Sequence, residues 1–200
     1  MTPIERALIQ VDSDLRQIGV PFALIGGLAV SLRAEPRTTR DVDLAVAVED
    51  DAGAERVIRG LLGLGYRVVQ QLEQDRAGRL ASVRFTLPNE PRFGIVVDLL
   101  FASSGIEREV VAAADELEIL RGFRMRVATA AHLVALKILA GRRQDRADVD
   151  ALLRELDVPG QENVRAALEL IARRGFDREK DLDRAYRRAL ASQVRGDEDE

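Results

Sequence analysis

Apolar residues recur at helical spacing over the first twenty positions of the chain. They are Ile4, Leu8, Val11, Leu15 and Ile18. This spacing places one apolar stripe along a helix and predicts that the helix packs against a core. The preceding Thr2-Pro3-Ile4-Glu5 is typical of a helix start, with Thr2 as the N-cap and Glu5 closing a capping box. We therefore expect a helix that begins after Thr2 and ends at Gly19.

Short apolar runs bounded by turn residues predict five strands in the first half of the chain. These runs are Phe22–Ile25, Val42–Val48, Tyr66–Leu72, Leu80–Leu87 and Gly94–Phe101. Turns are expected at Arg76-Ala77-Gly78 and at Pro88-Asn89-Glu90-Pro91. A short helix over Leu28–Leu32 follows directly on Gly26-Gly27, and a longer one runs from the cap at Glu49-Asp50-Asp51 to about Leu64.

Beyond residue 105 the pattern is mainly helical, with one small hairpin formed by Glu118–Leu120 and Arg124–Val127. The expected helices are Ile106–Ala114, a Thr129-capped helix to Ala140, Asp145–Leu156, Gln161–Arg174 and Arg178–Val194. The sequence therefore predicts an α+β fold. We expect residues 1–105 to form a core of sheet and helices, and residues 106–200 to form a mainly helical region packed on it.

Composition narrows the chemistry that the chain can perform. It has no cysteine and one histidine, His132, which excludes thiolate sites and metal sites that need two imidazoles. We expect His132 itself to be a packing or surface residue. The net charge of −4 argues against a general nucleic-acid coat. The chain contains neither a signal-peptide pattern nor an apolar run long enough to span a membrane, so we expect a cytoplasmic protein.

Three aspartates form the pattern that points to catalysis. Asp41 and Asp43 alternate with Val42 and Leu44, so in a strand both carboxylates project from one face. Two like charges this close repel each other, and a divalent cation between them removes that repulsion. Asp98 lies inside the most apolar run of the chain, where an unpaired aspartate is costly to bury. If the strands are neighbours, the three acids form an oxygen cage for Mg²⁺ or Mn²⁺.

A glycine turn precedes these acids. Gly26-Gly27 has no side chains, so its backbone N–H groups can approach phosphates at the start of the next helix. Lys137 adds to this pattern, because only two of the 30 basic residues are lysines and this one lies among apolar residues. A lysine there serves either as a phosphate ligand or as a residue whose stem packs while its amine reaches solvent. Together these features indicate metal-dependent nucleotide chemistry.

These residues resemble a known superfamily. Gly26-Gly27, followed by Arg37-x-Thr39-x-Asp41-x-Asp43 and later Asp98, is similar to the nucleotidyltransferase fold of DNA polymerase β-type enzymes. Two further runs resemble the AbiEii-like toxins of toxin–antitoxin pairs. They are Leu24-Ile25-Gly26-Gly27-Leu28-Ala29-Val30 and Ala135–Ala140 with Arg143–Leu153. The resemblance covers roughly residues 20–155, and many superfamily members have Ser where this chain has Gly27.

The resemblance implies a role for each matching residue. Asp41 and Asp43 would hold the metal, with Asp98 as the third acid and base for the acceptor hydroxyl. Gly26, Gly27, Arg37, Thr39 and Lys137 would bind the nucleotide, an NTP such as ATP. Asp148 would serve the active site from the following helix. Asp145 is more simply explained as a helix cap.

The implied reaction moves a nucleoside monophosphate from an NTP to an acceptor hydroxyl and releases pyrophosphate. The acceptor would be RNA, notably tRNA, or a partner protein, and a cognate antitoxin is an expected partner. Two arginine clusters favour RNA if they border one cleft: Arg33, Arg37 and Arg40, and Arg142, Arg143 and Arg146. Two alternatives stay open: a small-molecule acceptor of the antibiotic type, and a catalytically silent nucleotide- or partner-binding module similar to an antitoxin.

Overall fold

A computed structural model describes residues 1–36, 39–74, 78–88 and 94–196 of the chain. Within these residues the strands are β1 Phe22–Ile25, β2 Asp41–Val46, β3 Arg67–Gln74, β4 Arg79–Thr86, β5 Val96–Leu100, β6 Asp115–Leu120 and β7 Phe123–Val127. The helices are α1 Pro3–Ile18, α2 Gly26–Arg33, α3 Asp51–Gly63, α4 Glu107–Ala113, α5 Ala130–Ala140, α6 Arg143–Arg154, α7 Val158–Arg173 and α8 Leu182–Gly196. The predicted α+β class is confirmed.

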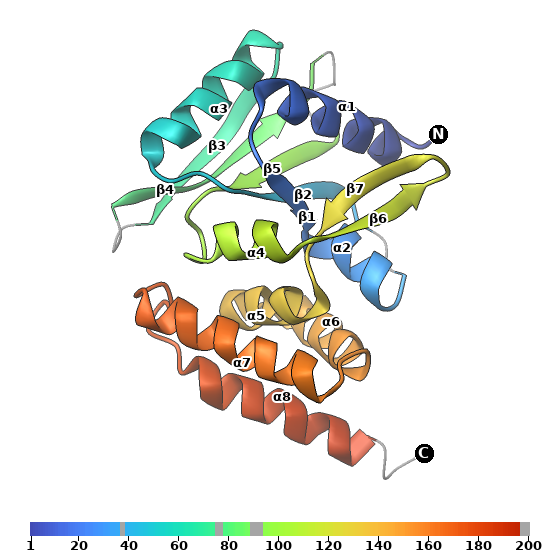
Figure 1. Cartoon of the computed structure of the whole chain (residues 1–200), viewed down its shortest axis with the longest axis vertical. Helices are drawn as coiled ribbons and strands as arrows, with labels where there is room; N and C mark the ends of the chain where they lie inside the picture. Colours follow the sequence, from blue (N-terminus) through green and yellow to red (C-terminus); the bar gives the residue numbers. More distant parts are fainter. Residues whose placement is uncertain (37–38, 75–77, 89–93, 197–200) are drawn as a thin grey trace.

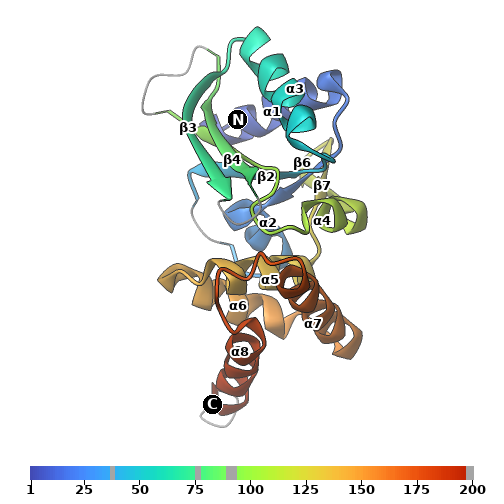
Figure 2. The ribbon, with the colours of Figure 1, turned by 90° about the vertical axis from the view of Figure 1, so that its left-hand side faces the viewer.

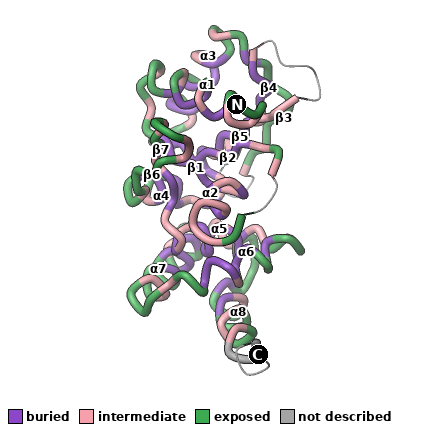
Figure 3. The backbone as a smooth tube through the Cα atoms, turned by 90° about the vertical axis from the view of Figure 1, so that its right-hand side faces the viewer, coloured by how far each residue is buried: buried purple, intermediate pink, exposed green. Residues whose placement is uncertain are grey.

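The seven strands form one mixed sheet in the order β3-β4-β5-β2-β1-β7-β6. The β2–β5 and β1–β7 pairs are parallel, and the other neighbouring pairs are antiparallel. Figure 3 shows the burial of the central strands. All four residues of β1 are buried, whereas buried apolar residues alternate with partly exposed ones at the start of β2 and along β5. The strand order fixes the Asp41–Asp43 strand next to the Asp98 strand.

Helices cover the sheet in layers. Figure 1 shows α1 and α3 on one side of the sheet and α2 and α4 on the other. The four C-terminal helices form a separate layer beyond α2 and α4, and α5 lies between α2 and the rest of that layer. The apolar faces of α5 and α7 meet there, with Leu133, Ile138, Val164 and Ile171 all buried. The cleft that the site occupies lies between this layer and the sheet.

The predicted N-caps of three helices are confirmed. Thr2 and Glu5 form the capping box at the start of α1, Asp50 caps α3 and Thr129 caps α5. The last helix begins later than the sequence pattern predicts. The pattern extended it back to Arg178, but α8 begins at Leu182 because the Asp181 carboxylate accepts the backbone N–H of Arg184 and so caps the helix there.

The predicted hairpin after residue 105 is confirmed as β6 and β7 and continues the sheet beyond β1. Strands from both sides of residue 105 therefore belong to one sheet. The division into domains at that residue stays a prediction. The predicted turns at Arg76-Ala77-Gly78 and Pro88-Asn89-Glu90-Pro91 lie largely outside the described residues.

Candidate active site

The strand register brings two of the three predicted acids side by side. Asp43 on β2 is directly opposite Asp98 on the parallel strand β5, and Asp41 lies two residues earlier on the same face of β2. Val42 and Leu44 point into the core and are fully buried, as the alternation predicts. The condition on which the acid cluster depended, that the two strands are neighbours, is therefore met.

Asp43 has an unusual electrostatic environment. Burial raises the pKa of its carboxyl from 3.8 to about 6, with further contributions from the negative charges of Asp98 and Asp41. Lys137 and Arg142 across the cleft lower the pKa by less. A divalent cation bound here would stabilise the ionised form of Asp43, because its positive charge offsets the repulsion among the three carboxylates.

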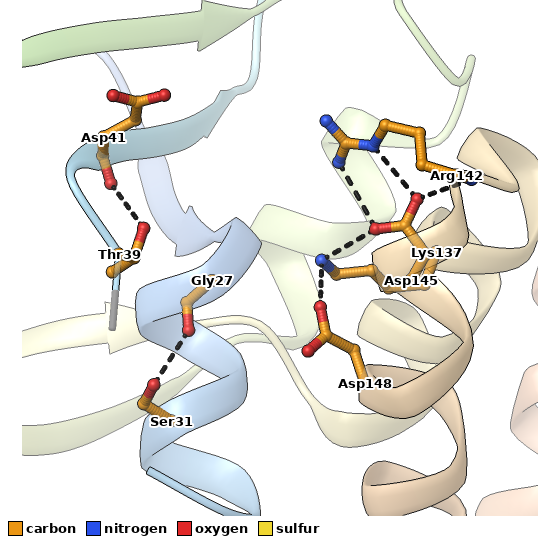
Figure 4. Close-up of polar contacts among 8 residues, drawn as sticks. All are labelled: Gly27, Ser31, Thr39, Asp41, Lys137, Arg142, Asp145 and Asp148. Atoms are coloured by element: carbon orange, nitrogen blue, oxygen red, sulfur yellow. Dashed lines mark hydrogen bonds and ion pairs between the residues drawn. The ribbon is translucent and has the colours of Figure 1, made fainter. Parts of the chain in front are cut away.

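The glycine turn contacts this carboxylate. Gly26 has a φ of +67°, and a Cβ built on it would lie 2.0 Å from Oδ2 of Asp43. A side chain at this position is therefore excluded both by the backbone conformation and by the space that Asp43 fills. The turn starts α2 directly, so the N–H groups at the start of that helix lie beside the acids. Gly27 is buried, and its carbonyl accepts a hydrogen bond from the Ser31 hydroxyl within the helix (Figure 4).

An arginine that the sequence reasoning missed holds the third acid. Arg84 on β4 lies directly opposite Asp98 and donates two hydrogen bonds to it, from Nε at 2.8 Å and from Nη2 at 2.6 Å. The same Nη2 is 3.7 Å from Oδ2 of Asp41. The sequence contained a signal for this arginine. Ser82, Arg84 and Thr86 alternate with buried apolar residues on one strand, so their side chains share a face.

Lys137 is buried between two carboxylates across the cleft from Gly27 (Figure 4). Its Nζ donates to Oδ1 of Asp145 at 3.1 Å and to Oδ2 of Asp148 at 2.6 Å. The side chain is 5% exposed, so the interpretation that its amine reaches open solvent is wrong. Two of the three ammonium donors are used by these contacts, which leaves one for a ligand in the cleft.

Asp145 has the capping role that the sequence favoured, and a second role as an ion-pair partner. Its Oδ2 accepts the backbone N–H of Arg142 at 2.9 Å and the Arg142 Nε at 3.0 Å (Figure 4). Burial raises the pKa of Asp145, but the hydrogen bonds from Arg142 and Lys137 outweigh burial and lower it overall. Lys137, Asp145, Asp148 and Arg142 thus form one charge-balanced network on α5 and α6.

A cavity of 330 Å³ joins these groups. Its lining includes both glycines of the turn, the three acids, Arg84, Lys137 and Arg142. Thr39 also lines it, and the Thr39 hydroxyl lies 3.5 Å from the Asp41 carbonyl (Figure 4). Asp148 accepts a hydrogen bond from Lys137 but does not line the cavity. Arg37 lies outside the described residues.

A second cavity, of 400 Å³, adjoins the first. It extends along β3 and β4 past Gln70, Leu72 and Ser82. The two cavities share Asp43, Asp98 and three arginines, Arg84, Arg142 and Arg178. The acids therefore lie at the junction of two spaces, which suits a reaction between two substrates.

The predicted arginine clusters are mostly elsewhere. Arg33 ties α2 to the end of β7 by donating to the carbonyls of Ala128 and Val127, and it pairs with Asp115. In the described part of the chain, Arg142 is the one member of either cluster that lines the cavities. His132 bonds to the Thr129 hydroxyl and lines neither cavity, in line with a packing role.

The acids fit a hard divalent cation by their chemistry but do not form a closed cage. No group of three or more acidic or histidine side chains is placed to hold a metal ion among the described residues. Both oxygens of Asp98 accept hydrogen bonds from Arg84. Asp41 and Asp43 supply carboxylate oxygens from one face of β2, the donor type that Mg²⁺ and Mn²⁺ prefer.

Two solved structures of ANT(2'')-Ia are similar in fold to this chain. The solution structure of the antibiotic-resistance factor ANT(2'')-Ia matches with a TM-score of 0.55 at 15% identity, over 87% of this chain and 94% of that one. The crystal structure of ANT(2'')-Ia in complex with adenylyl-2''-tobramycin matches with a TM-score of 0.56 at 14% identity, over 86% and 99%. At these identities the likeness shows the fold alone.

The family follows from the sequence model. Residues 13–200 match the family described as "Nucleotidyl transferase AbiEii toxin, Type IV TA system". The chain belongs to this family and is a nucleotidyltransferase. No curated protein matches it. Among the described residues, no helix is both long and apolar enough to cross a bilayer.

Proposed function

We propose that this nucleotidyltransferase moves an NMP from an NTP to a hydroxyl of RNA, such as tRNA, in a reaction that needs Mg²⁺ or Mn²⁺ and releases pyrophosphate. The observation that carries the proposal is the strand register that sets Asp43 beside Asp98, next to the Gly26-Gly27 turn. The two cavities that meet there would provide one space for the NTP and one for the acceptor. As an enzyme that consumes NTPs, it would act in the cytoplasm.

The NTP would occupy the first cavity. The N–H groups at the start of α2 are a natural site for phosphate oxygens, since Gly26 and Gly27 let a ligand approach the backbone. Lys137 lines the same cavity from α5, and its remaining donor would bind the triphosphate, with Asp145 and Asp148 fixing its position. Thr39 and Arg37 precede the acids in the chain and complete the proposed nucleotide-binding set.

Asp41 and Asp43 are the proposed metal ligands, with Asp98 as the third acid. A bound divalent cation would neutralise charge on the phosphates and favour attack by the acceptor hydroxyl. Asp98 would accept the proton of that hydroxyl. Arg84 positions the Asp98 carboxylate through two hydrogen bonds, and the second lone pair of each oxygen stays available to accept the proton.

The second cavity favours an anionic acceptor. Arg84, Arg142 and Arg178 contribute to its lining, and its carboxylates within the described residues are those of Asp43 and Asp98. Phosphates of RNA bind such arginines well. A cationic small molecule, such as an antibiotic of the kind named with ANT(2'')-Ia, would need acidic groups beyond the catalytic ones. This charge pattern makes RNA the better acceptor, and a partner protein the next.

The family also implies a partner. A type IV toxin–antitoxin system pairs the toxin with an antitoxin, so we propose that this chain acts as the toxin and has a cognate antitoxin. A catalytically silent binding module is the alternative. The chain retains both acids of β2, the acid of β5 and the glycine turn, which supports an active enzyme over a silent one.

The test is transfer of label from each α-labelled NTP, with Mg²⁺ and either total tRNA or bacterial lysate. We expect label in an RNA band with the wild-type chain and none with the Asp41→Ala/Asp43→Ala variant. Glu55→Gln, which removes an exposed carboxylate on α3, is the matched control and should retain activity. Label in a protein band would replace RNA by protein as the acceptor. No label in either, with NTP binding intact, would refute macromolecular transfer.

A further inference from the structure

The loop between α7 and α8 reaches the cleft from the C-terminal layer. We call residues 174–181 the strap. Arg178 within it lines both cavities, although it lies 80 residues after Asp98 in the chain and belongs to a region without a recognisable motif. Figure 2 shows this connection running past α5 before the chain turns into α8.

Several contacts hold the strap in place, and three of them flank or include Arg178. Nζ of Lys180 donates to the carbonyls of Leu139 at 2.6 Å and Ala140 at 3.0 Å, at the C-terminal end of α5. Phe176 packs on Gly105, where a Cβ would lie 2.5 Å from the aromatic ring. Nη2 of Arg178 donates to the carbonyl and the hydroxyl of Ser103, each at 3.1 Å. The position of Arg178 at the cleft is thus set by contacts on both sides of the strap.

The backbone at this point is strained. Arg178 and the following Glu179 have φ values of +54° and +61°, the left-handed region that residues with a Cβ rarely adopt. Two such residues in succession persist only where surrounding contacts hold them, and such strain gathers at functional sites. Here the left-handed pair coincides with the one point where the strap reaches the junction of the two cavities.

Arg178 differs in its partners from the other two arginines of the cleft. Arg84 is ion-paired with Asp98, and Arg142 with Asp145. The hydrogen bonds of Arg178 go to the uncharged oxygens of Ser103, and within the described residues it makes no ion pair. No ion-pair partner among the described residues therefore balances its charge, and several of its donors are left for an anion. The planar donor pattern of arginine matches phosphate oxygens.

We propose that Arg178 binds a phosphate group at the junction of the two cavities, and that the strap exists to place it there. This rests on the proposed function, since it concerns the same cleft. The phosphate belongs either to the NTP or to the RNA acceptor. Arg178 would thereby bring the connection between α7 and α8 into the reaction.

The experiment compares the wild-type chain, Arg178→Gln, Arg178→Lys and the control Arg184→Gln, an exposed arginine early in α8 that lines neither cavity. Binding of inorganic triphosphate and of a short RNA is measured separately by calorimetry with Mg²⁺ present. Neither titration holds both substrates, so no transfer occurs, and thermal melting is recorded for each variant. We expect Arg178→Gln to bind one of the two probes at least tenfold more weakly. Arg178→Lys should recover part of the loss, and Arg184→Gln should match the wild type.

The binding results distinguish the source of the phosphate from a purely structural role of Arg178. Weaker binding of triphosphate alone assigns Arg178 to the NTP, and weaker binding of RNA alone assigns it to the acceptor. Unchanged binding of both probes by Arg178→Gln and Arg178→Lys, with or without a lower melting temperature, would make Arg178 a structural residue and overturn the proposal while leaving the proposed function intact. If the wild-type chain itself bound neither probe, the proposed function would fail together with this inference.

Discussion

Replacing Asp43 by Asn should stabilise the metal-free protein at neutral pH. The carboxyl group is partly buried beside Asp98 and Asp41, and burial is the largest cause of the rise in its pKa to about 6. At pH 7 the wild-type protein must therefore hold an ionised group in a place that disfavours its charge. Asn keeps the shape of the side chain and removes the charge.

The magnitude follows from the shift in pKa. From 3.8 in the unfolded chain to about 6 in the folded one is about two pKa units, and each unit corresponds to about 1.4 kcal/mol, so the total is about 3 kcal/mol. Because the pKa is raised on folding, the folded state binds the proton more tightly. Wild-type stability should therefore fall as the pH rises from about 4 to about 7, and change little from this group outside that window.

The assay is urea unfolding of the wild-type and Asp43→Asn proteins in EDTA at several pH values between 4 and 8. We expect the free energy of unfolding of the variant, relative to the wild type, to increase by about 3 kcal/mol across this range. Repeating the measurement with Mg²⁺ at pH 7.5 should reduce the difference, because only the wild type has both proposed β2 ligands.

A difference that stays constant with pH would refute the electrostatic reasoning, since an offset without pH dependence reports packing and not ionisation. A variant that becomes less stable than the wild type as the pH rises would contradict it more strongly. That result would mean that Asp43 is held ionised by the cations across the cleft. Glu55→Gln serves as the control, because it removes an exposed carboxylate distant from the acids.

The remaining predictions concern the groups around these acids. Gly26→Ala should lower the free energy of unfolding by about 1–2 kcal/mol because of its φ of +67° alone. It should also abolish transfer, because the new Cβ displaces the Asp43 carboxylate. Unfolding and label-transfer assays check both effects, and an active, stable variant would contradict the geometry. Lys137→Met should cost about 3–5 kcal/mol, since two buried carboxylates lose their cation, and adding Asp148→Asn should restore part of the stability; no recovery would argue against the buried network. Arg84→Gln should increase the melting-temperature gain that Mg²⁺ produces, because Asp98 is released, whereas a smaller gain would show that Arg84 organises the site for the metal.

Much of the fold could be predicted because its signals are local. The capping residues Thr2, Asp50 and Thr129 act within one helical turn, and their helices begin where the sequence indicates. The alternation around Asp41 and Asp43 likewise fixes which side chains share a face, since a strand has a period of two. The late start of α8 is the instructive failure. The sequence interpretation began this helix at Arg178, and it did not take Asp181 as the cap.

The sequence by itself determined the chemical groups of the candidate site: the acids, the glycine turn and a lysine among apolar residues. Only the tertiary structure decided how they are paired. Arg84 meets Asp98 because β4 lies beside β5 in a particular register. Lys137 is buried by two aspartates because α6 packs on α5, and Arg178 reaches the cleft because the strap is anchored to segments far from it in the chain. Such pairings depend on strand order and helix packing, which no short stretch of residues specifies, and they decide which charges are left for a substrate.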